Sequence, residues 1–441
     1  MIKDKIVSAI GDSNVAIWGA RMTGMGAVRF LRSKGVEPRL FIDSDKSLSG
    51  KLISNLNVYN PLSLRKMVMN GDVETILIAV ALKEKEIKEE IERTLGKKNQ
   101  IKVFSFQDEE VPYYTVDILG SCNLKCSSCP HSIEDNNTPR GSMRYETFRK
   151  VFDKILRETP ELSHISLYSW GEPLIHPKVV DFVNLIHSKN IAVALSSNLS
   201  LNMPERLEDL VMSRPDVLKV SVSGFNQEVY GSTHEGGDIR LVKSNLYLLR
   251  YLMDKHKSSF LVDINYHLYR NNIGKDLQEF KSLANELGFV LSETYSLVMP
   301  LERVFNYLDG NSDKQTERLN KELLLVNIDE GIEASGGKGL PSRSCPYREN
   351  QINVNSDLSV PLCCLTFDRN KNSMVSNNYL EISFDEINKK KKKKEICLKC
   401  QSFGLQEYSM NSNRMEWELV ANRKITENAD FLTADGKVIA D

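Results

Sequence analysis

Short apolar runs alternate with longer amphipathic segments over the central part of the chain, from Pro112 to Met299. The apolar runs have the length of buried strands, and the segments between them repeat apolar residues every three or four positions, as helices do. The predicted strands are 113–119, 164–168, 191–196, 217–223, 260–266 and 289–296, and the predicted helices are 144–157, 177–188, 204–212, 238–255 and 275–287. Six β/α units predict a parallel sheet that curves into an open, partial (β/α)6 TIM barrel over residues 112–300.

The same alternation predicts a smaller α/β domain, Rossmann-like, over residues 1–111. Its expected strands are 14–19, 39–43 and 73–80, with one expected helix from after Gly26 to about Ser33 and another over 83–93. Glycines follow the first strand with the spacing G-x4-G-x-G, and an aspartate ends the second strand. These are the candidate nucleotide-binding residues Gly19, Gly24, Gly26 and Asp43. The alternative is a tight strand–helix turn in a docking domain, because the spacing departs from G-x-G-x2-G.

The remainder of the chain divides into three predicted segments. Residues 301–340 are expected to form a helical, acidic connector, and 341–405 a small cysteine-bearing domain. Within that domain, residues 351–360 alternate like a hairpin around Asn355. The lysine run 389–394 is typical of a solvated helix face or loop. Residues 406–441 form a tail without a readable motif.

Composition and charge narrow the function. The chain has 441 residues and a formal net charge of −1, which gives no electrostatic support for binding nucleic acid or a membrane surface. It has no apolar run close to the roughly 20 residues of a membrane span and no signal-like apolar segment at its start. We therefore expect a cytoplasmic protein, in a compartment where clustered cysteines bind metal.

The eight cysteines fall into two groups. Three lie in one loop after the first barrel strand, spaced C-x3-C-x2-C: Cys122, Cys126 and Cys129. Five lie near the C-terminus: Cys345, Cys363, Cys364, Cys397 and Cys400. Three thiolates on one loop can hold three corners of an iron–sulfur cube and leave the fourth iron open, as a catalytic metal centre requires. The distribution therefore predicts two metal sites on two domains.

Polar residues follow the next barrel strands. Gly171-Glu172-Pro173 follows the second, Ser196-Ser197-Asn198 the third, and Ser221 ends the fourth. Since the carboxyl ends of parallel barrel strands meet at one rim, these side chains are expected beside the three-cysteine loop.

The three-cysteine spacing, with Gly171-Glu172-Pro173 one β/α unit later, resembles the radical S-adenosylmethionine (radical SAM) superfamily. The resemblance implies a [4Fe-4S] cluster on the three cysteines and reductive cleavage of SAM to a 5′-deoxyadenosyl radical. It implies cofactor binding by Gly171 and Glu172, with Glu172 at the SAM amine, and contacts from Ser196, Asn198 and Ser221 to the carboxylate or ribose. Two positions depart from the family pattern: Ser128, where an aromatic or large apolar residue is common, and Trp170, where glycine is common.

The C-terminal cysteines resemble the SPASM and twitch auxiliary-cluster domains of that superfamily. Four of them would hold a second [4Fe-4S] cluster: Cys345, Cys363, Cys397 and Cys400. Cys363 matches the cysteine of the family's G-x4-C pattern, although Leu358 stands at the glycine. Cys364 is then left over, either as a structural thiol or as a hydrogen-atom donor to a substrate radical.

Zinc chemistry is the alternative at both sites. Cys122, Cys126, Cys129 and His131 would suffice for one zinc ion, and four C-terminal thiolates for another. With zinc at both sites, the chain would be a two-site zinc-binding scaffold protein. A dinucleotide-dependent dehydrogenase using Asp43 is a further alternative.

The resemblance favours an oxidoreductase that dehydrogenates or epimerises a small molecule, either a sugar, a nucleotide-sugar or an aminocyclitol. The alternative substrate is a peptide or protein, as in sulfatase maturation or the modification of ribosomal peptides. Residues 1–111 do not resemble a winged-helix peptide-recognition domain, which favours the small molecule. Expected partners are the substrate and an electron donor such as flavodoxin or ferredoxin.

Overall fold

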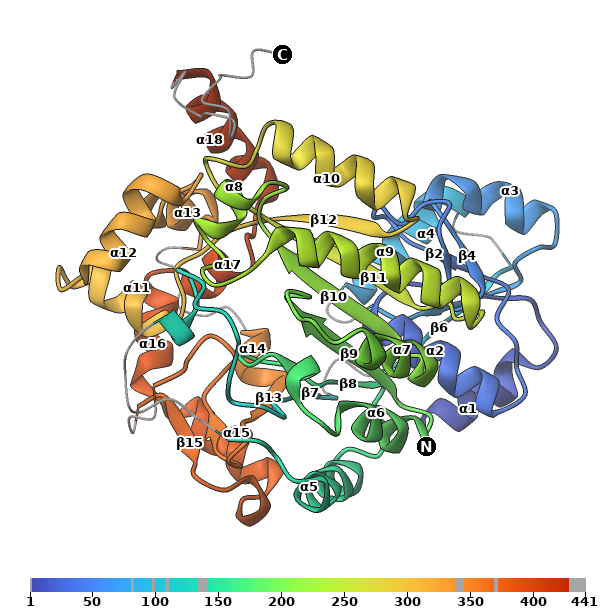
Figure 1. Ribbon diagram of the computed structural model, residues 1–441. Coiled ribbons are helices and arrows are strands. Elements are labelled where there is room, and N and C mark those ends of the chain that lie inside the picture. The colour runs from blue at the N-terminus through green and yellow to red at the C-terminus, as the bar shows by residue number, and fades with distance from the viewer. Residues whose placement is uncertain are drawn as a thin grey trace.

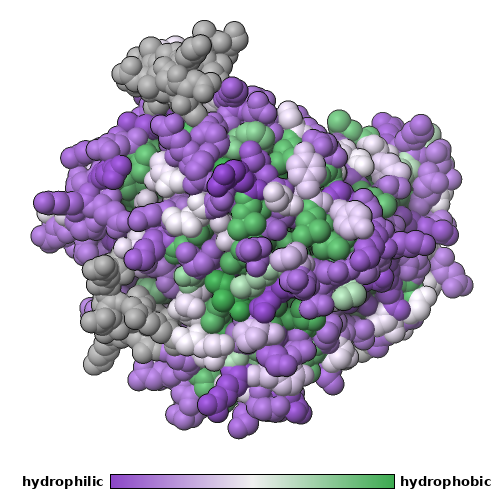
Figure 2. Space-filling view, viewed as in Figure 1, coloured by the Kyte–Doolittle hydropathy of each residue, from purple (hydrophilic) through white to green (hydrophobic). Residues whose placement is uncertain are grey.

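The computed structural model describes residues 2–80, 83–96, 100–107, 111–132, 141–337, 345–368 and 372–427 (Figure 1). Two largely parallel sheets organise the chain, and helices pack around them. The face drawn in Figure 2 is mainly hydrophilic, and its apolar side chains form small groups near the middle of the view. Among the described residues, no helix has the length and apolar character needed to cross a bilayer.

The N-terminal sheet has the strand order β3-β4-β2-β1-β5-β6. Its strands are β1 (Val15–Trp18), β2 (Leu40–Ile42), β3 (Leu52–Ile53), β4 (Leu56–Tyr59), β5 (Thr75–Ile78) and β6 (Lys102–Ser105). Its helices are α1 (Ile2–Ile10), α2 (Met22–Ser33), α3 (Leu64–Met69) and α4 (Glu84–Leu95). All neighbours pair in parallel except β3 and β4. The predicted α/β organisation is confirmed; the short strands β3, β4 and β6 and the helices α1 and α3 were not predicted.

The central sheet contains all six predicted barrel strands in sequential order. They are β7 (Tyr113–Val116), β8 (His164–Ser166), β9 (Ala192–Ser197), β10 (Val217–Val222), β11 (Leu261–Leu268) and β12 (Val290–Tyr295). The helices between them are α5 (Tyr145–Glu158), α6 (Val179–His187), α7 (Pro204–Ser213), α8 (Gln227–Gly231), α9 (Ile239–Lys255) and α10 (Lys275–Glu286). Every neighbouring pair is parallel, so the carboxyl ends of the six strands share one edge.

A seventh strand, β13 (Gln351–Val354), extends this sheet beside β7 and corrects the predicted hairpin. β13 pairs in parallel with β7, with Gln351 opposite Tyr113. The turn after it is present, since the Leu358 amide donates 2.9 Å to the Asn355 carbonyl. The next strand, β14 (Val360–Pro361), pairs instead with β15 (Met374–Ser376). Leu358 has φ +70°, a left-handed conformation that explains why a glycine is favoured there.

Helices dominate the chain after the barrel, as predicted for the connector. They are α11 (Leu301–Leu308), α12 (Lys314–Arg318), a π-helix (Leu319–Leu323), α13 (Ile328–Ala334), α14 (Pro346–Glu349), α15 (Phe384–Lys392), α16 (Glu395–Ser402), α17 (Leu405–Ser409) and α18 (Arg414–Glu427). The predicted tail is only partly a tail, because Trp417 is fully buried and its indole N–H donates 3.1 Å to Ser335 Oγ. Residues 428–441 lie outside the described residues.

The helix α2 joins the two sheets. Its first turn lies against the amino-terminal edge of the barrel, where Arg21 Nη1 donates 2.5 Å to Asp263 Oδ2 on β11. A Cβ atom at Gly26 would lie 2.5 Å from the Ser163 carbonyl oxygen, just before β8. The N-terminal sheet therefore closes the barrel from the edge opposite to the carboxyl ends of its strands.

Candidate active site

The three-cysteine loop leaves the carboxyl end of β7 and is shaped by backbone hydrogen bonds. The Cys129 amide donates 2.9 Å to the Cys126 carbonyl, which folds the second half of the loop into a turn. Two N–H groups point at the first sulfur: the Leu124 amide lies 3.4 Å and Asn198 Nδ2 3.6 Å from Cys122 Sγ. Such donors favour the thiolate, which is the form that binds metal.

Burial has the largest effect on the pKa values of these thiols. It raises the pKa of Cys122 to about 11 and that of Cys129 to about 12. The backbone amide of His131 and the guanidinium of Arg303 act on Cys129 in the opposite direction. Metal coordination deprotonates such cysteines, so the loop carries thiols suited to a metal centre and inert without one.

Gly171 and Glu172 form the facing side of the site. A Cβ atom at Gly171 would lie 1.6 Å from the Leu119 carbonyl oxygen, so only glycine fits against the cysteine loop. The carboxylate of Glu172 is buried and accepts hydrogen bonds from the amides of Leu174 at 3.1 Å and Asn198 at 2.8 Å. Its burial raises the pKa of Glu172 to about 7.

Asp117 supports this arrangement from β7 and was missed in the sequence. Its Oδ2 accepts a 3.3 Å hydrogen bond from the Trp170 amide, and burial raises the pKa of Asp117 to about 7. The available signal was an acid between Val116 and Ile118 in an otherwise apolar run. Asp117 thus fixes the loop that presents Gly171.

A cavity of about 380 Å³ opens between these groups. Its lining includes the three cysteines and every residue predicted to bind the cofactor: Gly171, Glu172, Ser196, Asn198 and Ser221. Three thiols fit an iron–sulfur cluster, while a buried carboxylate, an amide and hydroxyl groups fit the ammonium and ribose of SAM. The structure thus brings together residues that lie up to 99 positions apart, from Cys122 to Ser221.

The two departures from the family pattern also have structural partners. Ser128 accepts a 3.2 Å hydrogen bond from the hydroxyl of Tyr269, a buried residue that follows β11. Trp170 lines the cavity, and its ring meets Phe367 edge-on with centroids 5.7 Å apart. Aromatic rings therefore lie beside the loop although none lies within it.

The comparisons with known proteins agree with this geometry. Residues 116–265 match the radical SAM superfamily. These residues therefore form a radical SAM domain. The domain makes the chain a radical SAM enzyme and implies SAM and one [4Fe-4S] cluster, which confirms the resemblance found in the three-cysteine loop and removes the zinc-scaffold alternative.

Two curated relatives of this radical SAM enzyme are each 26% identical to it. A tungsten-containing aldehyde ferredoxin oxidoreductase cofactor-modifying protein from Pyrococcus furiosus aligns over 55% of this chain and 67% of its own length. An AdoMet-dependent heme synthase from Methanosarcina barkeri aligns over 41% of this chain, which spans about half (49%) of that relative. Among solved structures, anSMEcpe with bound AdoMet is 17% identical, with a TM-score of 0.44 over 71% of this chain and 97% of its own.

The C-terminal cysteines of this radical SAM enzyme form a second group. Cys345 precedes α14, Cys363 and Cys364 follow β14, and Cys397 and Cys400 lie on α16. Burial raises the pKa of Cys363, Cys397 and Cys400, and the thiol of Cys345 raises each of them further. Cys400 acts in the same way on Cys363. The four predicted ligands are therefore electrostatic neighbours.

Cys364 lies beside this group, and its thiol raises the pKa of Cys363 more than that of Cys400 or Cys345 does. Burial raises the pKa of Cys364 to about 12, and its thiol interacts with the side chain of Gln351 on β13. It is not among the residues that line the cavity beside Cys122. Its role as a hydrogen-atom donor stays a prediction.

Within the described part of the chain, no three His, Cys, Asp or Glu side chains are grouped as the ligands of one metal ion would be. The thiolates of a cubane cluster bind separate irons, so they do not converge on a point.

The candidate nucleotide-binding residues of the N-terminal sheet have structural partners. Asp43 accepts hydrogen bonds from the amides of Ala20 at 2.8 Å and Asp45 at 2.9 Å. A Cβ atom at Gly24 would lie 1.9 Å from the Gly19 carbonyl oxygen, and Gly26 packs on the barrel. Gly19 and Asp43 also line a cavity of about 740 Å³. These contacts agree with the docking-turn alternative, and nucleotide binding stays a prediction.

Proposed function

We propose that this radical SAM enzyme oxidises or epimerises an alcohol carbon of a small polyhydroxylated molecule, such as a sugar, a nucleotide-sugar or an aminocyclitol. The observation that carries the proposal is the part of the cavity lining not assigned to SAM, which is rich in hydroxyl groups: Tyr168, Ser169, Thr294 and Ser296. Hydroxyl groups donate and accept hydrogen bonds without charge, as the recognition of a neutral polyol requires. When bound, SAM and its cluster supply a radical that abstracts a hydrogen atom.

The residues around the cavity have separate tasks in this proposal. Glu172 would accept hydrogen bonds from the ammonium of SAM, a charge-assisted contact inside a buried site. Asn198, whose side chain also donates 3.0 Å to Asn123 Oδ1, would contact the carboxylate or ribose of the cofactor. The apolar Leu297 and Met299 line the same cavity and limit the access of water.

Two buried histidines support an uncharged substrate. Burial lowers the pKa of His234 to about 3 and that of His267 to about 4, so both rings are neutral at physiological pH. His234 Nδ1 lies 2.6 Å from Ser223 Oγ, and His234 lines the cavity. Neutral imidazoles can donate or accept a hydrogen bond from a substrate hydroxyl.

A second [4Fe-4S] cluster, held by Cys345, Cys363, Cys397 and Cys400, belongs to the same proposal. Its support is the electrostatic effect of Cys345 on the other three thiols and the partial or full burial of all four. The division into a domain at 1–111, a barrel at 112–300, a connector at 301–340, a cluster domain at 341–405 and a tail is part of this proposal. Flavodoxin or ferredoxin is the proposed electron donor.

The second candidate is modification of a cofactor or a peptide. The names of the curated relatives describe cofactor modification and heme synthesis, and neither names a peptide. The two candidates differ in the size of the substrate that must enter a cavity of about 380 Å³.

An anaerobic turnover assay tests the proposal. The reconstituted enzyme, SAM and a reductant are incubated with nucleotide-sugars, aminocyclitols, tetrapyrroles or peptides, and 5′-deoxyadenosine is measured with each. We expect substrate-dependent 5′-deoxyadenosine with a polyol and none with Cys126→Ala, while a surface variant such as Lys189→Ala stays active. Stimulation by peptides or tetrapyrroles alone would overturn the substrate class. Iron content near eight per chain, from two cubane clusters, tests the second cluster.

A further inference from the structure

One residue of the predicted solvated lysine run is buried. Lys391 has 0% relative exposure, whereas Lys389, Lys390 and Lys392 on the same helix are exposed. It lies one turn after Ile387, the other buried residue of α15, so both side chains point from one helix face into the protein. The surface interpretation of the run is therefore wrong at this position.

The ammonium of Lys391 is directed at the C-terminal cysteine group. It donates hydrogen bonds to the backbone carbonyls of Gln351 and, at 3.4 Å, of Tyr347, which is two residues after Cys345. The carbonyl of Lys391 itself lies 4.0 Å from Cys397 Sγ. The helix thus approaches the cysteine group through both its backbone and this side chain.

The titratable neighbours of Lys391 are thiols. Burial lowers the pKa of Lys391 to about 8, and the nearby thiols of Cys363, Cys364, Cys397 and Cys345 act in the opposite direction. The nearby Arg348 has a carboxylate of its own, since its Nη2 donates 2.7 Å to Glu349 Oε1. A buried ammonium is costly unless an anion compensates it. Four thiolates around a [4Fe-4S] centre carry net negative charge and provide that compensation.

We propose that Lys391 is a positioning residue that sets the reduction potential of the auxiliary cluster. This inference rests on the proposed second cluster. A fixed positive charge in a water-poor site stabilises the more negative, reduced state over the oxidised state. Lys391 thereby makes the cluster easier to reduce, and the hydrogen bonds to Tyr347 and Gln351 keep the charge in place when the cluster changes state.

The test uses the full-length chain with Cys122, Cys126 and Cys129 replaced by alanine, so that only the auxiliary cluster is reconstituted. In this background Lys391→Met removes the charge at similar length, and Lys391→Arg keeps it. Lys392→Met is the matched control, because Lys392 is the exposed next residue. Iron content and an electron paramagnetic resonance titration with dithionite report cluster loading and midpoint potential.

We expect Lys391→Met to disfavour reduction by about tenfold, ~59 mV lower for a one-electron couple. Lys392→Met should leave the potential unchanged, and Lys391→Arg should stay closer to the parent than Lys391→Met. An unchanged potential in Lys391→Met at full iron loading overturns the inference and leaves the second cluster standing. Absence of a cluster in the parent background overturns the second cluster itself.

A loss of iron from the auxiliary cluster can have two causes, and the variants distinguish them. If Lys391→Met loses iron while Lys391→Arg retains it, the charge is needed to hold the anionic site, which supports the inference. If both variants and Lys391→Gln lose iron, Lys391 acts through packing alone and the inference fails.

Discussion

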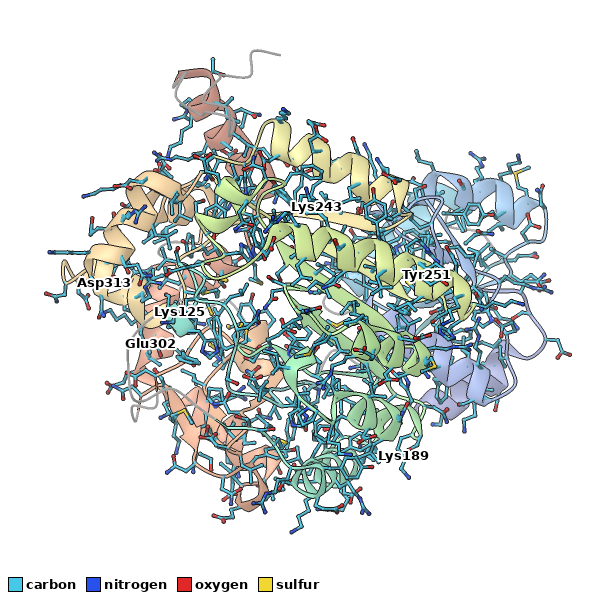
Figure 3. All side chains as sticks on the ribbon, in the orientation of Figure 1. Lys125, Lys189, Lys243, Tyr251, Glu302 and Asp313 are labelled. Atoms are coloured by element: carbon cyan, nitrogen blue, oxygen red, sulfur yellow. The ribbon has the colours of Figure 1, made fainter. Side chains whose placement is uncertain are left out.

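Arg303 donates a hydrogen bond of 2.9 Å from Nη1 to the carbonyl oxygen of Ser127, between the second and third cysteines of the SAM-cluster loop. The preceding residue, Glu302, accepts a 2.6 Å hydrogen bond from Ser373 and weaker ones from the amides of Phe367 and Asp368. Figure 3 labels Glu302 on α11, in the part of the molecule that also holds Lys125 of the cysteine loop. Two consecutive side chains therefore tie the SAM-cluster loop to the segment that follows Cys363 and Cys364.

Replacing Arg303 with methionine should loosen the cysteine loop. The side chain is only 4% exposed, and a charge-assisted hydrogen bond contributes about 1.5–3 kcal/mol. We expect a lower melting temperature and faster loss of iron from the loop to a chelator. Arg318→Met, at an arginine that is 72% exposed on α12, is the control. Equal iron loss in both variants would contradict the role of Arg303.

Replacing Gly171 with alanine should disrupt the cofactor site. The new methyl group would lie 1.6 Å from a backbone oxygen of Leu119, so the loop must move. Overpacking of this kind costs about 1–3 kcal/mol. We expect weaker SAM binding in anaerobic calorimetry and a lower unfolding midpoint. Gly231→Ala, whose methyl group meets only the end of the Gln227 side chain at 3.3 Å, should change neither by much.

SAM affinity should fall as the pH is lowered from 8 to 6. Burial raises the pKa of Glu172 to about 7, so the carboxylate that accepts from the SAM ammonium prevails above pH 7 and is protonated below it. One pH unit below the pKa, about a tenth of the groups remain ionised, which predicts a roughly tenfold decrease in the contribution of this contact. Binding isotherms at several pH values measure the effect. In Glu172→Gln the pH dependence should disappear, and an unchanged slope would assign it to another group.

Replacing Trp417 with alanine should destabilise the whole chain, although the residue lies beyond the predicted cluster domain. The indole is fully buried, lies 5.2 Å from the Tyr295 ring and donates to Ser335. Such truncations cost about 3–5 kcal/mol. Chemical denaturation should show the loss, whereas Leu419→Ala on the same helix, at a residue 55% exposed, should be nearly neutral.

The barrel could be predicted because its strands repeat with a regular spacing and its rim residues follow each strand directly. Glu172, Asn198 and Ser221 were therefore placed correctly beside Cys122 from local pattern alone. β13 could not be predicted in its position, since its partner Tyr113 lies far earlier in the chain and pairing across that separation leaves no local signal.

The burial of individual charged side chains was the second feature that could not be predicted from the sequence. Asp117 and Lys391 both stand in segments whose average character, apolar for one and highly charged for the other, hides the individual residue. Helical phase relative to Ile387 was the one available clue for Lys391, and it identifies a face without saying what that face meets. The glycines at positions 24 and 26 show a different limit. Their spacing suggested a nucleotide ligand, but close backbone packing also requires glycine at both positions.

β13 also protects the edge of the barrel sheet. Without it, the N–H and C=O groups of β7 that now bind β13 would be unpaired at an open strand edge, a surface that recruits strands from other molecules. A shortened chain ending before Gln351 would keep the SAM-cluster loop but expose this edge, and it should aggregate. Attempts to isolate the barrel for cofactor studies therefore need the C-terminal segment for solubility, independently of any cluster that it carries.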